Sequence, residues 1–219
     1  AGILMHITSL PGNHGIGDFG HTAYEFVEFL HRTGQSYWQI LPLSYIDEEG
    51  GYSPYSSLSA FAGNILFISL DILAEEGLLL AEEISNDVSS YNEEVHYKDV
   101  EAYKKLMLKK AYLHFKVNPE QTTREHYNHF CKQEKGWLED FALFMLFRNL
   151  YPGKAWNKWP VSIRDRKKEE LLKATSEHAD FIEETKFYQF LFYRQWHQLR
   201  SVANRKGIRI FGDSAIYVS

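Results

Sequence analysis

The residues whose side chains and order most clearly suggest chemistry lie in a loop, GYSPYSSLSAFAGN at 51–64. This loop holds no charged residue, and Tyr52, Ser53, Tyr55 and Ser56 stand near its start. Hydroxyls exchange hydrogen bonds with the hydroxyls of a ligand, and aromatic faces pack on its apolar faces. Because desolvating a charge is costly, an uncharged loop of this kind suits a neutral, hydroxylated ligand.

Further polar residues follow two other apolar runs of the chain. His6, Thr8 and Ser9 stand at the end of GILMHI, and Asp213 ends GIRIFGD. In parallel α/β folds, ligands bind at the carboxyl ends of the strands. We therefore expect these residues to cluster with the loop at 51–64.

Each of these residues also has a purely structural interpretation. Asp213 could cap the next helix, His6 could bond to a backbone carbonyl, and the SPY stretch could be only a turn. The glycine-rich segment GNHGIGDFG lacks the GxGxxG spacing and the following lysine of a phosphate-binding loop. It is more typical of a tight turn.

A strand–helix–strand unit is predicted to position these residues. Apolar runs at 2–7 and 37–43 predict strands buried on both faces. Between them, residues 22–34 predict a helix with one apolar face, made by Ala23, Phe26, Val27 and Leu30. Short connections favour parallel pairing with a right-handed crossover.

The ends of these elements carry their own signals. Thr22 and Glu25 predict a capping box for the first helix, and Gly34 predicts its end. Residues 64–70 are interpreted as extended and 80–99 as a solvated acidic stretch. Helices are expected at 71–77, 100–115, 137–150, 162–175 with Ser162 as cap, and 187–207, before a third strand that ends at Asp213.

Composition excludes several classes of protein. The net charge of −5 gives no electrostatic case for a nucleic-acid partner. Cys131 is the only cysteine, so neither an internal disulfide nor a cysteine zinc site is expected. No apolar run is long enough to span a bilayer, and no membrane partner is expected. A cytoplasmic location fits these features.

Several stretches together resemble the amylomaltases, also called 4-alpha-glucanotransferases or disproportionating enzymes. The resemblance runs from Gly2 to Ser219, and its most specific parts are the SPYSSLSAFAGN loop and the GIRIFGD ending. Supporting stretches are GILMHITSLPG, GIGDFG, GQSYWQILPL, WLEDFALF and QFLFYRQW.

The resemblance implies an α/β fold, the N-terminal part of a (β/α)8 barrel with its first three strands. Residues 1–219 would form an incomplete catalytic domain, with a mostly helical insertion at about 65–185 between strands two and three. Both ends of the sequence lie inside apolar runs, so we expect a longer protein.

The resemblance also implies a function. Such enzymes transfer α-1,4-glucan segments to the 4-hydroxyl of an acceptor by a retaining mechanism, without cofactor or metal. Ser53 and Tyr55 would touch glucose near the cleavage point, and Asp213 would bind sugar hydroxyls. The catalytic carboxylates are expected beyond Ser219. The expected partners are α-1,4-glucans, maltooligosaccharides and the remainder of the catalytic domain.

Two other hypotheses remain open from the sequence. The first is a non-catalytic glucan-binding module built on the same loop. The second is a metal-dependent barrel hydrolase using His6, His14, His21 and Asp213. The segment His6-Ile7-Thr8 lacks the second histidine that closely spaced metal ligands would need, which disfavours the second hypothesis.

Overall fold

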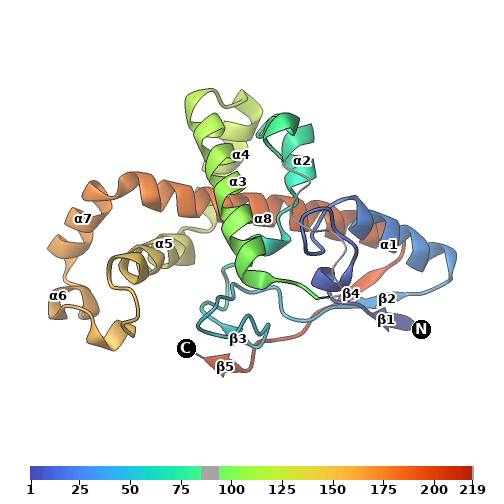
Figure 1. The fold of residues 1–219 in the computed structure, drawn as a ribbon, viewed down its shortest axis with the longest axis horizontal. Coiled ribbons are helices and arrows are strands. Elements are labelled where there is room, and N and C mark those ends of the chain that lie inside the picture. Colours follow the sequence, from blue (N-terminus) through green and yellow to red (C-terminus); the bar gives the residue numbers. More distant parts are fainter. Residues whose placement is uncertain (85–93, 219) are drawn as a thin grey trace. The chain divides into compact units, whose positions relative to one another are not determined.

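The computed structural model describes residues 1–84 and 94–218. The chain divides into two compact units (Figure 1). The first comprises Ala1–Pro119 with Leu191–Ser219, and the second comprises Glu120–Phe190. Part of the predicted solvated stretch, 85–93, lies outside the described residues.

The first unit contains a parallel three-stranded sheet in the order β1-β2-β4 (Figure 1). Its strands are β1 Gly2–Leu4, β2 Tyr37–Gln39 and β4 Arg209–Phe211. The pairing of β1 with β2 and of β2 with β4 is parallel, which confirms the predicted strand–helix–strand unit. The strands are shorter than predicted, because His6 already precedes a 3₁₀ turn at Ile7–Ser9.

The two faces of this sheet differ in burial. Ile3, Trp38 and Ile210 are in register, and the Trp38 ring is fully buried against Phe26 with centroids 5.1 Å apart. The opposite face carries large exposed side chains: Leu4 at 55%, Tyr37 at 41% and Phe211 at 58%. The prediction of strands buried on both faces is therefore wrong for the described residues, because these residues cover only one face of the sheet.

Helix α1 spans His21–Arg32 and packs by the face that the sequence predicted. Ala23, Val27 and Leu30 are buried, as the helical spacing requires. The predicted capping box is wrong, because Gly20 is the N-cap and no side chain caps this end. Gly34 has a φ of 70° and ends the helix as predicted, since that conformation favours glycine.

The segment at 64–70 is a pair of capped turns, so its extended interpretation is wrong. The Asn64 side chain accepts a hydrogen bond from the Leu66 N–H at 3.0 Å, which starts a 3₁₀ turn at Ile65–Phe67. Ser69 then caps α2, Leu70–Glu75, by accepting from the Ile72 N–H. Side-chain acceptors of this kind compete with an extended backbone.

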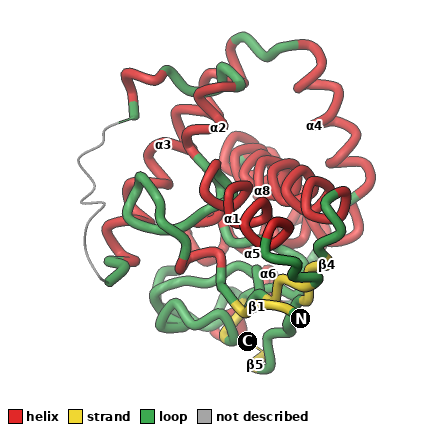
Figure 2. The backbone as a smooth tube through the Cα atoms, turned by 90° about the vertical axis from the view of Figure 1, so that its right-hand side faces the viewer, coloured by secondary structure: helices red, strands yellow, loops and turns green. Residues whose placement is uncertain are grey.

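Helices make up most of the remaining described chain (Figure 2). The predicted cap at Ser162 is wrong, because two short helices replace the single one expected at 162–175, with Arg166 at a φ of 55° between them. The last helix begins earlier than residue 187, where the sequence placed its start. Its end just before Gly207 agrees with the prediction. The bounds are α3 Tyr97–Val117, α4 Gln121–Gln133, α5 Lys135–Leu150, α6 Val161–Arg164, α7 Lys168–Glu177 and α8 Ala179–Arg205.

A buried lysine joins α3 to the core of the first unit. Lys104 is 0% exposed, and its Nζ donates to the Asp18 carboxylate at 2.8 Å. The same Nζ donates to the carbonyls of Leu66 at 2.8 Å and Ile68 at 2.7 Å. All three donors of the ammonium are therefore used, which is what allows a charge to be buried here.

Within residues 1–84 and 94–218, none of the helices combines the length and apolar character that crossing a membrane requires.

Candidate functional site

The base of the loop at 51–64 is closed by backbone pairing. Ser44 forms an antiparallel bridge with Gly63, and the Tyr45 N–H donates to the Ala62 carbonyl at 2.8 Å. Gly63 leaves no room for a side chain, because a Cβ there would lie 2.2 Å from the Phe192 ring. The loop therefore starts and ends at fixed points on the core of the first unit.

Two of the four serines in the loop hold the loop itself together. The buried Ser57 hydroxyl lies 2.7 Å from the Ser59 carbonyl, to which it donates. The Ser59 hydroxyl oxygen accepts from the N–H groups of Phe61 and Ala62 at 3.2 and 3.1 Å. Such side-chain turns explain part of the hydroxyl content of the loop without any ligand.

Tyr52 is directed to α3. Its hydroxyl donates to Glu101 at 2.6 Å, and its ring stacks on Tyr97 with centroids 5.0 Å apart. Burial raises the pKa of Tyr52, and the hydrogen bond to the Glu101 carboxylate raises it further. Tyr52 therefore helps to fix the loop, and among the described interactions none joins its side chain to Ser53, Tyr55 or Asp213.

A small second sheet brings the loop to the segment that follows β4. β3, Ser56–Ser57, pairs in parallel with β5, Tyr217–Val218. The Tyr217 N–H also donates to the carbonyl of Tyr55 at 3.1 Å. As a result, two segments far apart in the sequence lie side by side.

Tyr55 and Asp213 meet directly at this junction. The Tyr55 hydroxyl donates to Oδ2 of Asp213 at 2.9 Å, while Oδ1 of Asp213 accepts from the Ser214 N–H at 2.8 Å. The hydrogen bond to Asp213 raises the pKa of Tyr55, because the carboxylate favours the neutral phenol. Ser53 lies on the same turn, and its hydroxyl oxygen accepts from the Tyr55 N–H at 3.3 Å.

A cavity of about 390 Å³ opens beside Asp213. Hydroxyl groups from the loop and from the segment after β4 line much of it. Sequence reasoning did not single out Ser44, Ser214, Ala215 or Tyr217, although Ser44 directly follows the strand predicted at 37–43 and Ser214 directly follows Asp213. The lining residues are Ser44, Ser57, Leu58, Ser59, Ala60, Asp213, Ser214, Ala215 and Tyr217.

The residues after β1 do not join this cluster. The His6 Nδ1 accepts a hydrogen bond from the Leu41 N–H at 3.3 Å, and burial lowers the pKa of His6 to about 4. His6 is therefore neutral near pH 7, with its proton on Nε2. Thr8 and Ser9 lie in the turn at Ile7–Ser9. Among the described interactions, none joins these three residues to Tyr55 or Asp213, so the expected clustering is only partly met.

The four residues of the metal hypothesis have separate partners. The Nε2 of His14 lies 3.2 Å from Asp71 Oδ1, and the Nε2 of His21 lies 2.6 Å from Glu75 Oε1. In the ranges 1–84 and 94–218, no group of three or more histidine, cysteine, aspartate or glutamate residues is arranged to hold a metal ion. This geometry gives the metal hypothesis no support.

The family of the chain follows from comparison with known proteins. A family model described as 4-alpha-glucanotransferase matches residues 5–219. Similar proteins named 4-alpha-glucanotransferase are found in Clostridium butyricum, at 43% identity over 98% of this chain, and in Streptococcus pneumoniae, at 42% over 100%. The chain spans about 43% of the length of each of these relatives. The chain belongs to the 4-alpha-glucanotransferase family, which confirms the resemblance.

Solved structures agree with this assignment. The amylomaltase from Streptococcus agalactiae in complex with acarbose is 39% identical, with a TM-score of 0.90. The match covers 100% of this chain and 43% of that one. The amylomaltase from Corynebacterium glutamicum is 18% identical, with a TM-score of 0.72 over 99% of this chain and 30% of that one, and shares the fold. The α/β fold with a small parallel sheet is thus that of the matching part of the amylomaltases.

Proposed function

We propose that the protein carrying this chain transfers segments of α-1,4-glucans to the 4-hydroxyl of an acceptor glucan or glucose. The single observation that carries this proposal is the Tyr55–Asp213 pair beside a hydroxyl-lined cavity, in a chain of this family. The acarbose bound to the related amylomaltase supports a glucan-like ligand.

In this proposal, the chain supplies one wall of the glucan groove. The Asp213 carboxylate accepts hydrogen bonds from sugar hydroxyls, and its bond to Tyr55 holds it in one orientation. Ser53 keeps its hydroxyl proton for donation, because the hydroxyl oxygen accepts from the Tyr55 N–H. The Tyr55 ring offers an apolar face to a sugar ring.

The chemistry itself would come from carboxyl groups outside residues 1–219. One carboxylate attacks the anomeric carbon while a second carboxylic acid protonates the departing glycosidic oxygen. The acceptor 4-hydroxyl then attacks the glycosyl-enzyme, and the second group, now ionised, takes its proton. No cofactor or metal takes part in this scheme.

We further propose that β1, β2 and β4 are the first strands of a (β/α)8 barrel. Their exposed face carries Leu4, Tyr37 and Phe211, large side chains of the kind that fill a barrel interior. Residues 1–219 are then an incomplete barrel domain, with the mostly helical segment at about 65–185 as an insertion. The rest of the domain would cover the exposed face.

Incubation of the complete protein with maltotriose tests this proposal. A transferase gives a ladder of glucose, maltose and longer maltooligosaccharides. Shorter products alone would mean hydrolysis and would contradict transfer. Binding of maltooligosaccharides without any product would instead support the non-catalytic glucan-binding module.

A further inference from the structure

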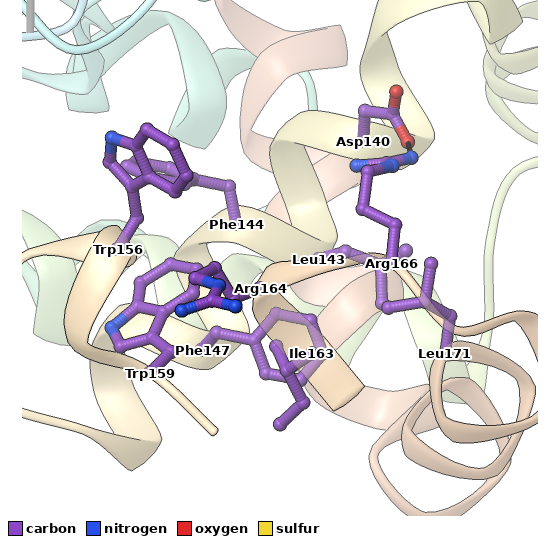
Figure 3. A pocket seen from close by; sticks show the side chains of 10 residues that line it. All are labelled: Asp140, Leu143, Phe144, Phe147, Trp156, Trp159, Ile163, Arg164, Arg166 and Leu171. Carbon is purple, nitrogen blue, oxygen red and sulfur yellow. Dashed lines mark hydrogen bonds and ion pairs between the residues drawn. The ribbon is translucent and has the colours of Figure 1, made fainter. Parts of the chain in front are cut away.

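A second cavity lies within the 120–190 unit and shares no residue with the cavity at Asp213 (Figure 3). Its volume is about 190 Å³. Aromatic rings and ion-paired side chains line it together, and the residues that matter most are Phe144, Trp156, Trp159, Arg164, Arg166 and Asp140.

The two indoles of this cavity differ in how they are held. Trp159 is only 7% exposed, its Nε1 donates to the Lys154 carbonyl at 3.1 Å, and its ring packs on Phe144 and Phe147. Trp156 is 54% exposed. Among the described residues, none accepts a hydrogen bond from the Trp156 indole N–H. Trp159 therefore forms the floor, while Trp156 presents a large aromatic face and a polar N–H to solvent.

The charges around the cavity balance one another. Arg166 donates to Asp140 at 2.5 Å, and Figure 3 shows its guanidinium directed at that carboxylate. The Nε of Arg164 donates to Asp165 at 2.8 Å. Each arginine thus has a carboxylate partner, so an anionic ligand would meet as much repulsion as attraction. A guanidinium has five N–H donors, so both arginines keep donors for neutral acceptors.

These features select a ligand of one chemical class. A purely aliphatic ligand would leave the polar rim desolvated and unpaired. A neutral ring with an apolar C–H face and hydroxyls at its edge satisfies both the indoles and the rim. A pyranose ring has this chemistry.

We propose that this cavity, which we call the Trp156 pocket, binds a glucose residue of an α-1,4-glucan chain. This inference rests on the proposed function, because that function supplies the glucan.

Fluorine NMR of the complete protein labelled with fluorotryptophan tests this proposal, with maltoheptaose as the probe. The resonances of Trp156 and Trp159 shift and saturate, while that of Trp137 in the same unit stays in place. Turnover only redistributes chain lengths, so the probe remains an α-1,4-glucan. In a Trp156→Ala variant, the Trp159 shift needs about two- to tenfold more maltoheptaose to saturate.

The outcomes separate the two proposals. A maltotriose ladder with no shift at Trp156 or Trp159 contradicts glucan binding in the Trp156 pocket and leaves the transferase function in place. The same outcome is expected if the rest of the protein covers the pocket. Saturating shifts without a ladder support the pocket and contradict the transferase. Absence of both contradicts both.

Discussion

The Tyr55 hydroxyl donates a hydrogen bond of 2.9 Å to the Asp213 carboxylate, although 158 positions separate the two residues in sequence. The pairing of β3 with β5 places the two segments side by side, and the backbone bond from Tyr217 to Tyr55 reinforces it. The pair is partly open to solvent and adjoins a hydroxyl-lined cavity. The pair therefore lies at the surface and does not hold the core together.

Tyr55→Phe removes this hydrogen bond and keeps the ring. We expect kcat/KM for maltotriose to fall about 10- to 100-fold, since a hydrogen bond to a charged group contributes about 1.5–3 kcal/mol. The melting temperature of the complete protein should change little. Tyr188→Phe is the matched control, because it removes a tyrosine–carboxylate bond to Glu184 in the other unit. Equal losses in both variants would argue against a site at Tyr55.

Lys104→Met tests the buried cation. The substitution leaves the Asp18 carboxylate and the carbonyls of Leu66 and Ile68 without their donor, so we expect a loss of about 3–5 kcal/mol in unfolding free energy. Lys98→Met, which breaks the exposed pair with Glu48, should cost less than about 1 kcal/mol. Denaturant titrations measure both. A loss for Lys104→Met no larger than for Lys98→Met would contradict this role.

Gly63→Ala tests the close contact at the base of the loop. A Cβ at this position lies 2.2 Å from the Phe192 ring, so the loop or the ring must shift. We expect a loss of about 1–3 kcal/mol in stability and a fall in maltotriose turnover, since the same base positions Tyr55. Gly136→Ala in α5 meets no atom within 4 Å and should be neutral or stabilising. Unchanged stability in Gly63→Ala would show that the contact relaxes freely.

The depressed pKa of His6 predicts a pH dependence of stability. The folded protein protonates His6 near pH 4, whereas the unfolded chain does so near 6.5. The unfolded state therefore binds more protons between these values, and stability falls as the pH drops from about 6.5 to 4. The expected loss is about 2–3 kcal/mol.

His6→Asn isolates this effect from the other titrating groups. Its amide oxygen can still accept from the Leu41 N–H but does not titrate. As the pH falls toward 4, the wild type loses the stability that depends on neutral His6, whereas the variant does not. The difference between their urea midpoints should therefore become smaller. Parallel pH profiles would show that His6 titrates alike in the folded and unfolded states.

The hydrophobic pattern predicted the sheet and α1 because burial dictates residue spacing. Ala23, Val27 and Leu30 recur at helical spacing, and the fold buries all three. The sequence signals failed at the N-terminus of α1, where Gly20 is the N-cap and the expected capping box is absent. The hydrophobic pattern also could not show that one face of the sheet is exposed in the described chain. An apolar run has the same sequence whether residues of this chain or other residues cover it.

The candidate site was predictable only in part. The rule of strand ends, together with the family resemblance, placed Tyr55 and Asp213 in one site. The two-residue strands β3 and β5 are too short to have a readable period, so their pairing was missed. Tyr52 and His6 have the right residue types, but the Tyr52 hydroxyl is bonded to Glu101 and the His6 Nδ1 accepts from the Leu41 N–H.

The most direct test of the glucan site is the Asp213→Ala variant of the complete protein, assayed on maltotriose. The proposal predicts a fall in kcat/KM of about 100-fold or more, because several hydrogen bonds to sugar are lost, with an unchanged melting temperature. Glu28→Gln, which alters the exposed pair with Lys206, serves as control and should retain activity. A variant Asp213→Ala that still builds the full ladder at the wild-type rate would contradict the assignment of this cavity as the glucan site.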